Sequence, residues 1–382
     1  MGGENYMKIV IAPDSYKGSL TATEVAITIS DAILETGDHQ VICKPMADGG
    51  EGTIDAILSA SNGENIKLST SGPLGNTINT NYAMINNSTA VIETALHAGL
   101  YQVPTDQRNP DHTTTYGIGE AILDAMDKGC KQIVVGLGGS ATNDGGLGLL
   151  QALGLKVYNK LGNQLDKYGQ DLLKIDSVDV SNLDPRLKTI DFRIACDVEN
   201  PLYGEMGASA VYGPQKGATP NQVLEYDQAL KKYARLIEAI LGHEWHDTPG
   251  AGAAGGLGFA FLAIGGKLES GGAKLIAESI NLEETIKSAD LVITGEGQSD
   301  EQTLYGKAPG YVADVAHLYN VPTILISGSL GENNQALRDK FAGCFSIVNR
   351  PLSLEDCMKN TRTLLAEQTK QIMTLIHKTR AR

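Results

Sequence analysis

Several glycine-containing loops in this 382-residue chain carry acidic, basic and hydroxyl side chains that could act on a phosphate group. The first loop, APDSYKGS at residues 12–19, holds Asp14, Ser15, Lys17 and Ser19 directly after an apolar run. A carboxylate, an ammonium group and two hydroxyls in one loop could bind a small polar substrate or its phosphate. The structural alternative is a turn in which Ser19 or Thr21 caps the following helix.

A second loop, MADGGEGT at residues 46–53, flanks paired glycines with Asp48 and Glu51. Carboxylate oxygens are the ligands that Mg²⁺ prefers, and exposed backbone amides attract phosphate oxygens. Capping of a helix by Asp48 is plausible, but it requires neither Glu51 nor three glycines. The segment therefore predicts a site for magnesium and phosphate.

The segment GLGGSATNDGGLG, residues 136–148, has six glycines among thirteen residues and lies between a β-rich run and a helix. Backbone amides at such a turn, with the positive end of the helix, favour phosphate. Its GxGxxA pattern is a weak dinucleotide signal, and the next strand ends in Tyr158 with no acidic residue for a ribose, which disfavours NAD. The candidate phosphate-binding residues are Gly138, Gly139, Ser140 and Asn143.

A second glycine pattern, GAGAAG at residues 250–255, matches GxGxxG but follows no predicted strand. We interpret it as part of a helix over residues 251–264 that packs through small side chains.

The segment TGEGQSDEQTLYGKAPG, residues 294–310, supplies Glu296, Asp300 and Lys307 after another predicted strand. It is not a Walker A motif, because no glycine lies five positions before Gly306 and no Ser or Thr follows the lysine. Phosphoryl transfer uses metal ligands, a cation for the developing charge and a carboxylate that receives the acceptor's proton. This segment offers all three, and a solvated surface loop is the alternative.

The predicted elements that position these loops alternate between strand and helix at both ends of the chain. Strands at 7–12 and 40–45 flank a helix at 21–36, and the last hundred residues add three more strands with helices between them. A turn at residues 86–88 predicts a hairpin between the two ends. The fold class predicted is α/β, with two α/β domains: a small doubly wound parallel sheet made from both chain ends, plus an inserted mixed-sheet domain. The predicted boundaries assign residues 1–70 and 285–382 to a discontinuous flavodoxin-like domain, and residues 71–284 to the inserted domain.

The composition narrows the class of protein further. The chain has 31 Lys and Arg residues against 45 Asp and Glu residues, a net charge of −14, which argues against a general nucleic-acid binder. Five widely spaced cysteines without a CxxC pair predict neither a disulfide framework nor a structural zinc site. The first residues lack the basic region and apolar run of a signal peptide, and no segment has the length and apolarity of a membrane span. We therefore expect a cytoplasmic protein.

The four loops, taken with ACDVENPLYG (195–204), VYGPQKGA (211–218) and QRNPDHTTTYGIGE (107–120), closely resemble the type-1 glycerate kinase family of bacteria. The resemblance extends from about residue 7 to about residue 370. It implies ATP-dependent phosphorylation of D-glycerate to 2-phosphoglycerate, with Mg²⁺, in a cleft between two α/β domains.

The same resemblance implies roles for individual residues. The catalytic candidates are Asp197, Asp300 and Lys17, and the general base is either Asp197 or Asp300. Metal-ligand candidates are Asp48, Glu51 and Glu296. ATP and its phosphates are assigned to Gly138, Gly139, Ser140, Asn143, Lys216 and Lys307. Substrate-binding candidates are Asp14, Ser19, Arg108, Thr114 and Thr115; Arg108 is included because a guanidinium group fits a carboxylate through two hydrogen bonds.

Other readings of the sequence remain open. A glycerate kinase that forms 3-phosphoglycerate would have the same motifs, and a phosphatase or phosphosugar isomerase would also use phosphate-binding loops. A non-catalytic sensor of a hydroxy acid is the alternative from another class, although simple anion binding does not call for so many carboxylates. The expected ligand is a small molecule, D-glycerate, with no nucleic acid or membrane partner, in a monomer or a homodimer.

Overall fold

The computed structural model describes residues 6–332 and 334–380, and the chain divides into two compact units. The first unit runs to Asp48 and includes Asp55–Asn62 and Gly271–Arg382. The second unit comprises Gly49–Ile54 and Gly63–Ser270. These limits lie earlier in the chain than the predicted ones, near 70 and 285, because the strand at residues 64–71 pairs within the second sheet and the helices between residues 272 and 286 belong to the first unit.

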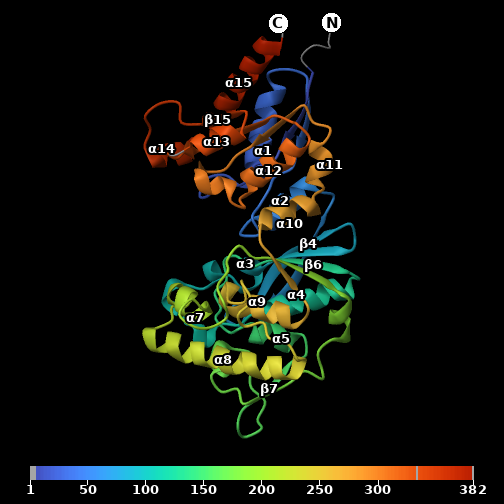
Figure 1. Ribbon diagram of the computed structural model, residues 1–382, viewed down its shortest axis with the longest axis vertical. Helices are drawn as coiled ribbons and strands as arrows, with labels where there is room; N and C mark the ends of the chain where they lie inside the picture. Colours follow the sequence, from blue (N-terminus) through green and yellow to red (C-terminus); the bar gives the residue numbers. More distant parts are fainter. Residues whose placement is uncertain (1–5, 333, 381–382) are drawn as a thin grey trace. The chain divides into compact units, whose positions relative to one another are not determined.

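The first unit contains a five-stranded parallel sheet drawn from both ends of the chain (Figure 1). Its strands are β1 (Lys8–Ile11), β2 (Gln40–Cys43), β11 (Leu291–Thr294), β13 (Thr323–Ser327) and β15 (Gly343–Ser346). They lie in the order β15-β13-β11-β1-β2, which is the flavodoxin-like order. Ile9 of β1 pairs with Leu291 of β11, and Ile11 of β1 pairs with Cys43 of β2. Strand β1 therefore joins strands from the two ends of the chain in one sheet.

Both faces of this sheet are covered by helices, as β13 shows. Ile324 and Ile326 pack in the cluster that contains α1 (Ala22–Leu34) and α15 (Thr361–Arg380), whereas Leu325 packs with α12 (Ala308–Leu318) and α13 (Gln335–Lys340). Successive strand residues point to opposite faces, so a run of apolar residues is expected when both faces are buried. The remaining elements of this unit are α10 (Gly272–Ser279), α11 (Leu282–Ile286), β12 (Gln298–Ser299), η6 (Glu301–Leu304), β14 (Ser329–Leu330), α14 (Leu354–Lys359) and most of α2 (Thr53–Ala60).

The second unit has a six-stranded mixed sheet in the order β10-β9-β6-β5-β4-β3. Its strands are β3 (Glu64–Ser71), β4 (Thr77–Ile85), β5 (Thr89–Glu93), β6 (Gln132–Gly136), β9 (Asp191–Ala195) and β10 (Lys267–Glu269). The hairpin at residues 86–88 makes β4 antiparallel to β5, and β5, β6, β9 and β10 are parallel. Together the two sheets confirm the predicted fold class.

The helices of the second unit include α4 (Tyr116–Asp127), which packs on β3 and β5, and α8 (Pro220–Leu241), which begins with the capping box of Thr219 and Gln222. The other elements are α3 (Thr94–Ala98), α5 (Leu147–Ala152), α6 (Gly169–Leu172), α7 (Ala208–Tyr212), α9 (Ala253–Ala263), the short strands β7 (Lys156–Tyr158) and β8 (Ser177–Asp179), and the 3₁₀ turns η1 (Leu100–Gln102), η2 (Thr105–Gln107), η3 (Pro110–His112), η4 (Pro185–Thr189) and η5 (Pro214–Lys216).

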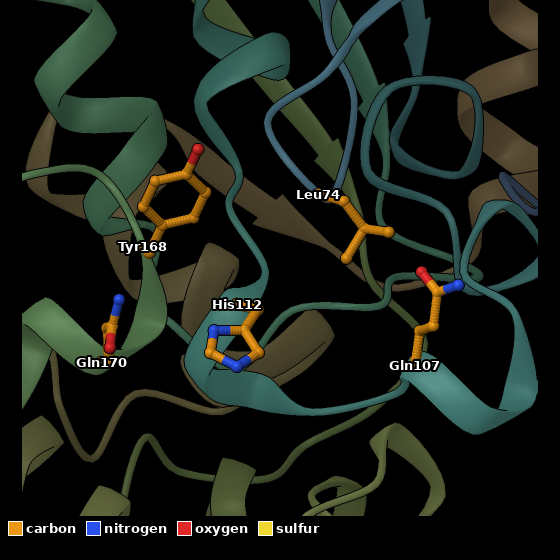
Figure 2. Close-up of a pocket in the computed structure, with 5 residues that line it drawn as sticks. All are labelled: Leu74, Gln107, His112, Tyr168 and Gln170. Carbon is orange, nitrogen blue, oxygen red and sulfur yellow. The ribbon is translucent and has the colours of Figure 1, made fainter.

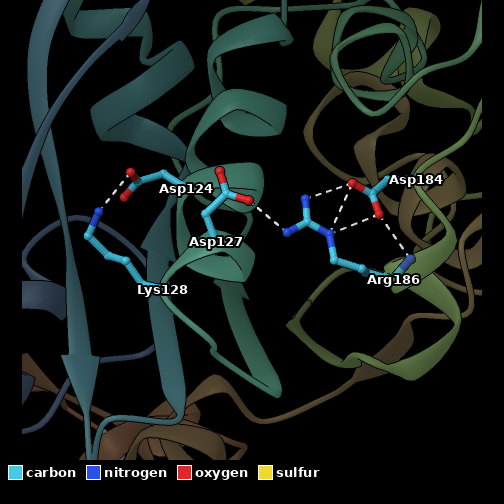
Figure 3. A network of polar contacts seen from close by, with 5 residues as sticks. All are labelled: Asp124, Asp127, Lys128, Asp184 and Arg186. Atoms are coloured by element: carbon cyan, nitrogen blue, oxygen red, sulfur yellow. Dashed lines mark hydrogen bonds and ion pairs between the residues drawn. The ribbon is translucent and has the colours of Figure 1, made fainter.

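An ion-pair network fixes the turn that leads into β9 (Figure 3). Arg186 Nη1 lies 2.6 Å from Asp127 Oδ1 at the end of α4, and its Nη2 lies 2.7 Å from Asp184 Oδ2. Beside it, Lys128 Nζ contacts Asp124 Oδ1 at 2.8 Å. Because these side chains are in part exposed to solvent, we ascribe to their ion pairs the orientation of the turn and only a small share of the free energy of folding.

One predicted helix differs from the observed structure. Where a helix was expected over 251–264, Ala254, Gly255 and Gly256 have positive φ, so the end of GAGAAG forms a left-handed turn before the regular part of α9. At the end of the chain, α14 and α15 are separate helices that meet at Asn360. All five cysteines are free thiols, and no helix in the described part of the chain is long and apolar enough to cross a bilayer.

Candidate active site

A pocket of about 710 Å³ lies at the carboxyl edge of the sheet in the first unit. The loops that follow β1 and β11 both line it, and these adjacent strands are where the order of the sheet reverses. In open α/β sheets, ligands bind in the crevice at such a point. Six sequence-predicted site residues line this pocket: Asp14, Lys17, Ser19, Asp48, Glu296 and Lys307.

The acidic side chains in this pocket repel one another. Burial and, next, the negative charge of Asp48 together raise the pKa of the Asp14 carboxyl to about 6, against the hydrogen bond from Ser15 N and the charge of Lys17. Lys17 Nζ lies 3.9 Å from Asp48 Oδ2, and its side chain is well exposed. A cation placed among these groups would relieve the repulsion.

Glu296 is held firmly by its neighbours. Its Oε1 accepts hydrogen bonds from Ser299 Oγ at 3.0 Å and from Thr303 Oγ1 at 2.6 Å, and its Oε2 lies 3.6 Å from Lys307 Nζ. Lys307 is the residue from which α12 begins, and no side chain caps that end of the helix. The positive end of α12 therefore lies beside a lysine that already faces the pocket.

Asp300, a predicted general base, does not line this pocket and has a structural role. Its Oδ1 accepts a hydrogen bond from Gln302 N at 2.9 Å, and its own N–H donates to Thr303 Oγ1, so it caps η6. Ser19, a predicted glycerate ligand, donates its hydroxyl to Thr361 Oγ1 at 2.6 Å. Both side chains thus order the loops that carry them.

The second unit brings two glycine-rich segments together. The last residues of the parallel strands β5, β6, β9 and β10 pair with one another in one row: Glu93, Gly136, Ala195 and Glu269. The loops that follow these strands therefore leave from the carboxyl edge of the sheet. A Cβ on Gly136 would lie 2.0 Å from the carbonyl oxygen of Gly49. Only glycine allows this contact between the 136–148 segment and the start of GGEG.

Lys216 supports the 136–148 segment from the protein interior. Its Nζ donates to Ser140 Oγ at 2.9 Å and to the Thr142 carbonyl oxygen at 2.6 Å, and the side chain is buried. This burial lowers the pKa of Lys216 to about 7. Asn143, also buried, donates to Ser209 Oγ at 2.9 Å, while Gly138 and Gly139 are exposed. Three predicted phosphate ligands therefore have buried side chains that are bonded within the protein, whereas the glycine pair is exposed.

Sequence reasoning missed Asp144, which lies within the same segment. The buried carboxylate accepts hydrogen bonds from Thr115 Oγ1 at 2.7 Å, from Thr115 N and from two amides of the turn, Gly146 N and Gly148 N. Thr114 Oγ1 donates to the Lys167 carbonyl oxygen. Thr114 and Thr115 are fully buried, so the two predicted glycerate ligands have hydroxyls that are already bonded within the protein.

Arg108 has a different environment. Within the described chain its buried Nε has no hydrogen-bond partner, and its carbonyl oxygen lies beside Gly217, next to Lys216. A buried donor without a partner is costly, which makes this guanidinium group a candidate for a ligand carboxylate.

The neighbouring segment lines a smaller pocket of about 440 Å³ (Figure 2). Figure 2 shows Gln107 and His112 on one segment, with Leu74, Tyr168 and Gln170 from other segments around the same hollow. None of these lining residues is a carboxylate, lysine or arginine. This pocket therefore lacks the charges that phosphoryl transfer requires.

The remaining predicted residues lie in exposed loops of the second unit. Asp197 follows β9 and is exposed, and Glu51 is exposed in the GGEG loop. Asp48 and Glu296 belong to the first unit, so the predicted metal set draws on both units. Among residues 6–332 and 334–380, no three or more His, Cys, Asp and Glu side chains form a group that could hold a metal ion on their own.

Glu93 is the other residue that sequence reasoning missed, although its place at the end of a predicted strand was a usable signal. The buried carboxylate accepts a hydrogen bond from Ile54 N at 3.2 Å, in the first turn of α2, just after GGEG (residues 49–52). Burial raises the pKa of Glu93 to about 7, against the hydrogen bonds from the backbone of this segment.

Comparison with known proteins agrees with the resemblance noted in the loops. The model of the glycerate kinase family matches residues 9–377. A glycerate kinase from Halalkalibacterium halodurans is 44% identical over 369 residues, which cover 95% of this chain and 97% of that protein. A glycerate 2-kinase from Escherichia coli K12 is 47% identical over 330 residues, which cover 86% of each chain.

A solved structure is similar over its whole length. The crystal structure of a protein provisionally designated glycerate kinase 2, from Salmonella typhimurium LT2, has a TM-score of 0.88 and 42% identity, and the match covers 99% of this chain and 100% of that one. The predicted family is confirmed by these matches. The chain belongs to the glycerate kinase family and is accordingly a kinase.

Proposed function

We propose that the protein transfers the terminal phosphoryl group of ATP to the C2 hydroxyl of D-glycerate, forming 2-phosphoglycerate with the help of Mg²⁺. The observation that carries this proposal is the pocket of the first unit, where Asp14, Asp48 and Glu296 lie with Lys17 and Lys307. Carboxylates and lysines at one sheet edge are what metal-assisted phosphoryl transfer uses. The name of the Escherichia coli relative, glycerate 2-kinase, supports C2 as the acceptor position.

The donor set of this pocket fits Mg²⁺. All three acidic groups offer carboxylate oxygens, and their mutual repulsion helps to raise the pKa of Asp14. Kinase sites hold Mg²⁺ through one or two carboxylates together with substrate phosphates, so Asp48 and Glu296 suffice as protein ligands. When bound, the ion neutralises charge on the phosphate oxygens. Glu51 belongs to the other unit, and its part in metal binding stays a prediction.

For the glycerate end of the reaction, we assign Arg108 to the substrate carboxylate. Its buried Nε is without a partner in the described chain, and a guanidinium group can donate two parallel hydrogen bonds to a carboxylate. Thr114 and Thr115 would act indirectly, by holding the segment that follows Arg108. The exposed Gly138 and Gly139, next to Ser140 that Lys216 holds, offer backbone amides suited to phosphate.

We assign the general base to Asp197 in preference to Asp300. The carboxylate of Asp300 caps η6 and does not line the pocket, and Asp197 lies exposed at the carboxyl end of β9, where the loops of the second sheet leave. As the bond between the glycerate oxygen and the γ-phosphorus forms, the hydroxyl proton passes to this carboxylate, and the bond from phosphorus to the oxygen of ADP breaks. Lys17 and Lys307 stabilise the negative charge on the phosphoryl oxygens.

The test mixes purified protein with ATP, Mg²⁺ and D-glycerate and follows the reaction by phosphorus NMR. A 2-phosphoglycerate signal that disappears when Mg²⁺ is omitted is the expected result. A 3-phosphoglycerate signal would keep the kinase chemistry and correct the product. Binding of glycerate with no phosphoester formed would favour the sensor over the enzyme that we propose.

Location and assembly belong to the same proposal. Five free thiols suit a reducing compartment, so we propose a cytoplasmic enzyme. Whether it acts as a monomer or a homodimer is a matter for light scattering of the purified protein.

A further inference from the structure

The pocket of the first unit has two chemically different walls. The charged wall consists of the loops after β1 and β11 with Asp48 and Lys307. The apolar wall follows β15 and continues into α14, and its side chains are Ile347, Val348, Leu352, Leu354, Cys357 and Met358. We infer that the apolar wall binds the base of the nucleotide, while the charged wall binds its phosphates. This inference rests on the proposed function and assigns the nucleotide to the first unit.

The size and polarity of the pocket separate its two possible ligands. Glycerate is a small acid whose every carbon carries oxygen, so it gains little from an apolar wall. Pockets of about 300–1,000 Å³ hold ligands of drug or cofactor size, and this one measures about 710 Å³. A nucleotide has a flat apolar base at one end and a charged phosphate chain at the other, which matches the two walls.

Two side chains of the apolar wall are exposed in a way that a ligand would explain. Leu354 is 76% exposed and Met358 39% exposed, although both are large and apolar. Apolar side chains that gather beside a polar pocket commonly mark a binding surface. The thioether of Met358 is also suited to the face or edge of an aromatic ring.

Hydrogen bonds join the apolar wall to the loop after β1, so the two walls belong to one site. Ser19 Oγ donates to Thr361 Oγ1 at 2.6 Å and contacts the Met358 carbonyl oxygen at 3.2 Å. Ile347 lies in the main core cluster of this unit, and Leu352 packs against that cluster. In this reading, Ser19 positions the nucleotide wall and is not a glycerate ligand.

The charged wall can hold the phosphate chain without a Walker A loop. Lys17 and Lys307 supply positive charge, and α12 begins at Lys307 without a side-chain cap. The first helix, α1, is different, because Thr21 and Glu24 close its first turn with a capping box. The open helix end beside Lys307 is therefore the better neighbour for phosphate oxygens.

Cys357 allows a direct binding test that does not depend on turnover. It is a free thiol that lines the apolar wall, whereas Cys344 is a half-buried free thiol of the same unit outside the lining. The full-length protein is treated with a small maleimide, and modification of each cysteine is followed by peptide mass spectrometry. With ADP and Mg²⁺ at about ten times the Kd, modification of Cys357 should slow about tenfold by mass action, and that of Cys344 should not change.

Two further ligands complete this test. D-glycerate alone and tripolyphosphate with Mg²⁺ should leave Cys357 reactive, because neither carries a base. Equal protection by tripolyphosphate would overturn the inference, as would unprotected Cys357 in a protein that turns over ATP. Protection by ADP in a protein without kinase activity would keep the nucleotide pocket and reject the proposed function instead.

A matched pair of variants tests the apolar wall in the kinase assay. Leu354→Asp introduces a carboxylate at an exposed position of the wall, and Leu318→Asp makes the same change at a 70% exposed residue at the end of α12, outside the lining. Leu354→Asp should raise the KM for ATP about tenfold, the equivalent of about 1.4 kcal/mol, without changing the KM for glycerate. An effect on glycerate and not on ATP would show that the pocket serves the acceptor.

Discussion

Lys216 Nζ donates a hydrogen bond of 2.9 Å to Ser140 Oγ, from a side chain that is buried beneath the 136–148 segment. A second bond from the same nitrogen reaches the Thr142 carbonyl oxygen. Burial lowers the pKa of Lys216 to about 7, so near neutral pH the group is present both as ammonium and as amine. Either form has enough hydrogens for two acceptors, which means that the loop stays supported on both sides of pH 7.

Replacement of this lysine tests its supporting role. Lys216→Met keeps the apolar part of the side chain but leaves the Thr142 carbonyl without its donor, which costs about 1–3 kcal/mol for a buried group. We expect a lower free energy of unfolding in urea and a fall in kcat/KM of about tenfold or more. Lys160→Met, in an exposed turn of the same unit, is the control. Wild-type kinetics in a folded Lys216→Met protein would remove the residue from the site.

The buried carboxyl of Glu93 should make the free energy of unfolding depend on pH. The pKa of its buried carboxyl is raised from 4.5 to about 7, so between these values the folded protein binds more protons than the unfolded chain. Stability from this group is therefore fully present below pH 4.5 and is lost as the pH rises through 7. Glu93→Gln should reduce that loss, because the amide has no charge to bury.

Urea unfolding at pH 5 and pH 8 measures this effect. The difference in unfolding free energy between the two pH values should be smaller in Glu93→Gln than in the wild type. Glu225→Gln, an exposed residue on α8, serves as the control. Equal differences in all three proteins would mean that Glu93 does not titrate in this range.

The acidic cluster of the first unit predicts a response to Mg²⁺. Burial is the largest cause of the raised pKa of Asp14, about 6, and the charge of Asp48 is the next. Asp48→Asn should therefore lower the titration midpoint of the Asp14 carboxyl, while leaving it above 3.8. Mg²⁺ should lower the midpoint in the wild-type protein, because a bound cation favours the carboxylate form.

Carbon-13 NMR of labelled aspartate follows this titration, with NaCl at matched ionic strength in place of MgCl₂. Asp55→Asn, an exposed position on α2, controls for the general change of charge. A midpoint that Mg²⁺ does not move would contradict a metal site at Asp48 and Glu296, beside Asp14.

The strands of the first sheet were predictable because they are short apolar runs between helical segments. β11 and β13 are buried on both faces, so their sequences LVIT and TILIS carry the signal by themselves. β10 was not predicted, because its sequence KLE has the composition of a surface segment. Its neighbour Arg193 forms an ion pair with Glu269 at 2.6 Å, a contact that the local sequence does not reveal.

Tertiary packing also explains where a prediction from the sequence was wrong. A Cβ on Gly255 would lie 2.0 Å from the Thr142 carbonyl oxygen, so this close approach holds GAGAAG in a left-handed turn in place of a helix. The sequence correctly predicted that this segment packs closely through small residues, but it did not predict the conformation of the segment. In the same way, the loops of the candidate site could be found from glycines and carboxylates, whereas the burial of Thr114 and Thr115 depends on α4 and α5 packing together.

The identity of the general base can be decided by two matched substitutions. Asn caps a helix about as well as Asp, so Asp300→Asn should keep the cap of η6 and leave both kcat and stability close to wild type. Asp197→Asn removes the proposed proton acceptor from the end of β9, and we expect kcat to fall about 10²-fold or more with little change in the unfolding free energy. Steady-state kinetics with saturating ATP and glycerate, together with urea unfolding, measure both quantities. A large loss of kcat in Asp300→Asn beside normal turnover in Asp197→Asn would reverse the assignment, and normal turnover in both variants would exclude both carboxylates.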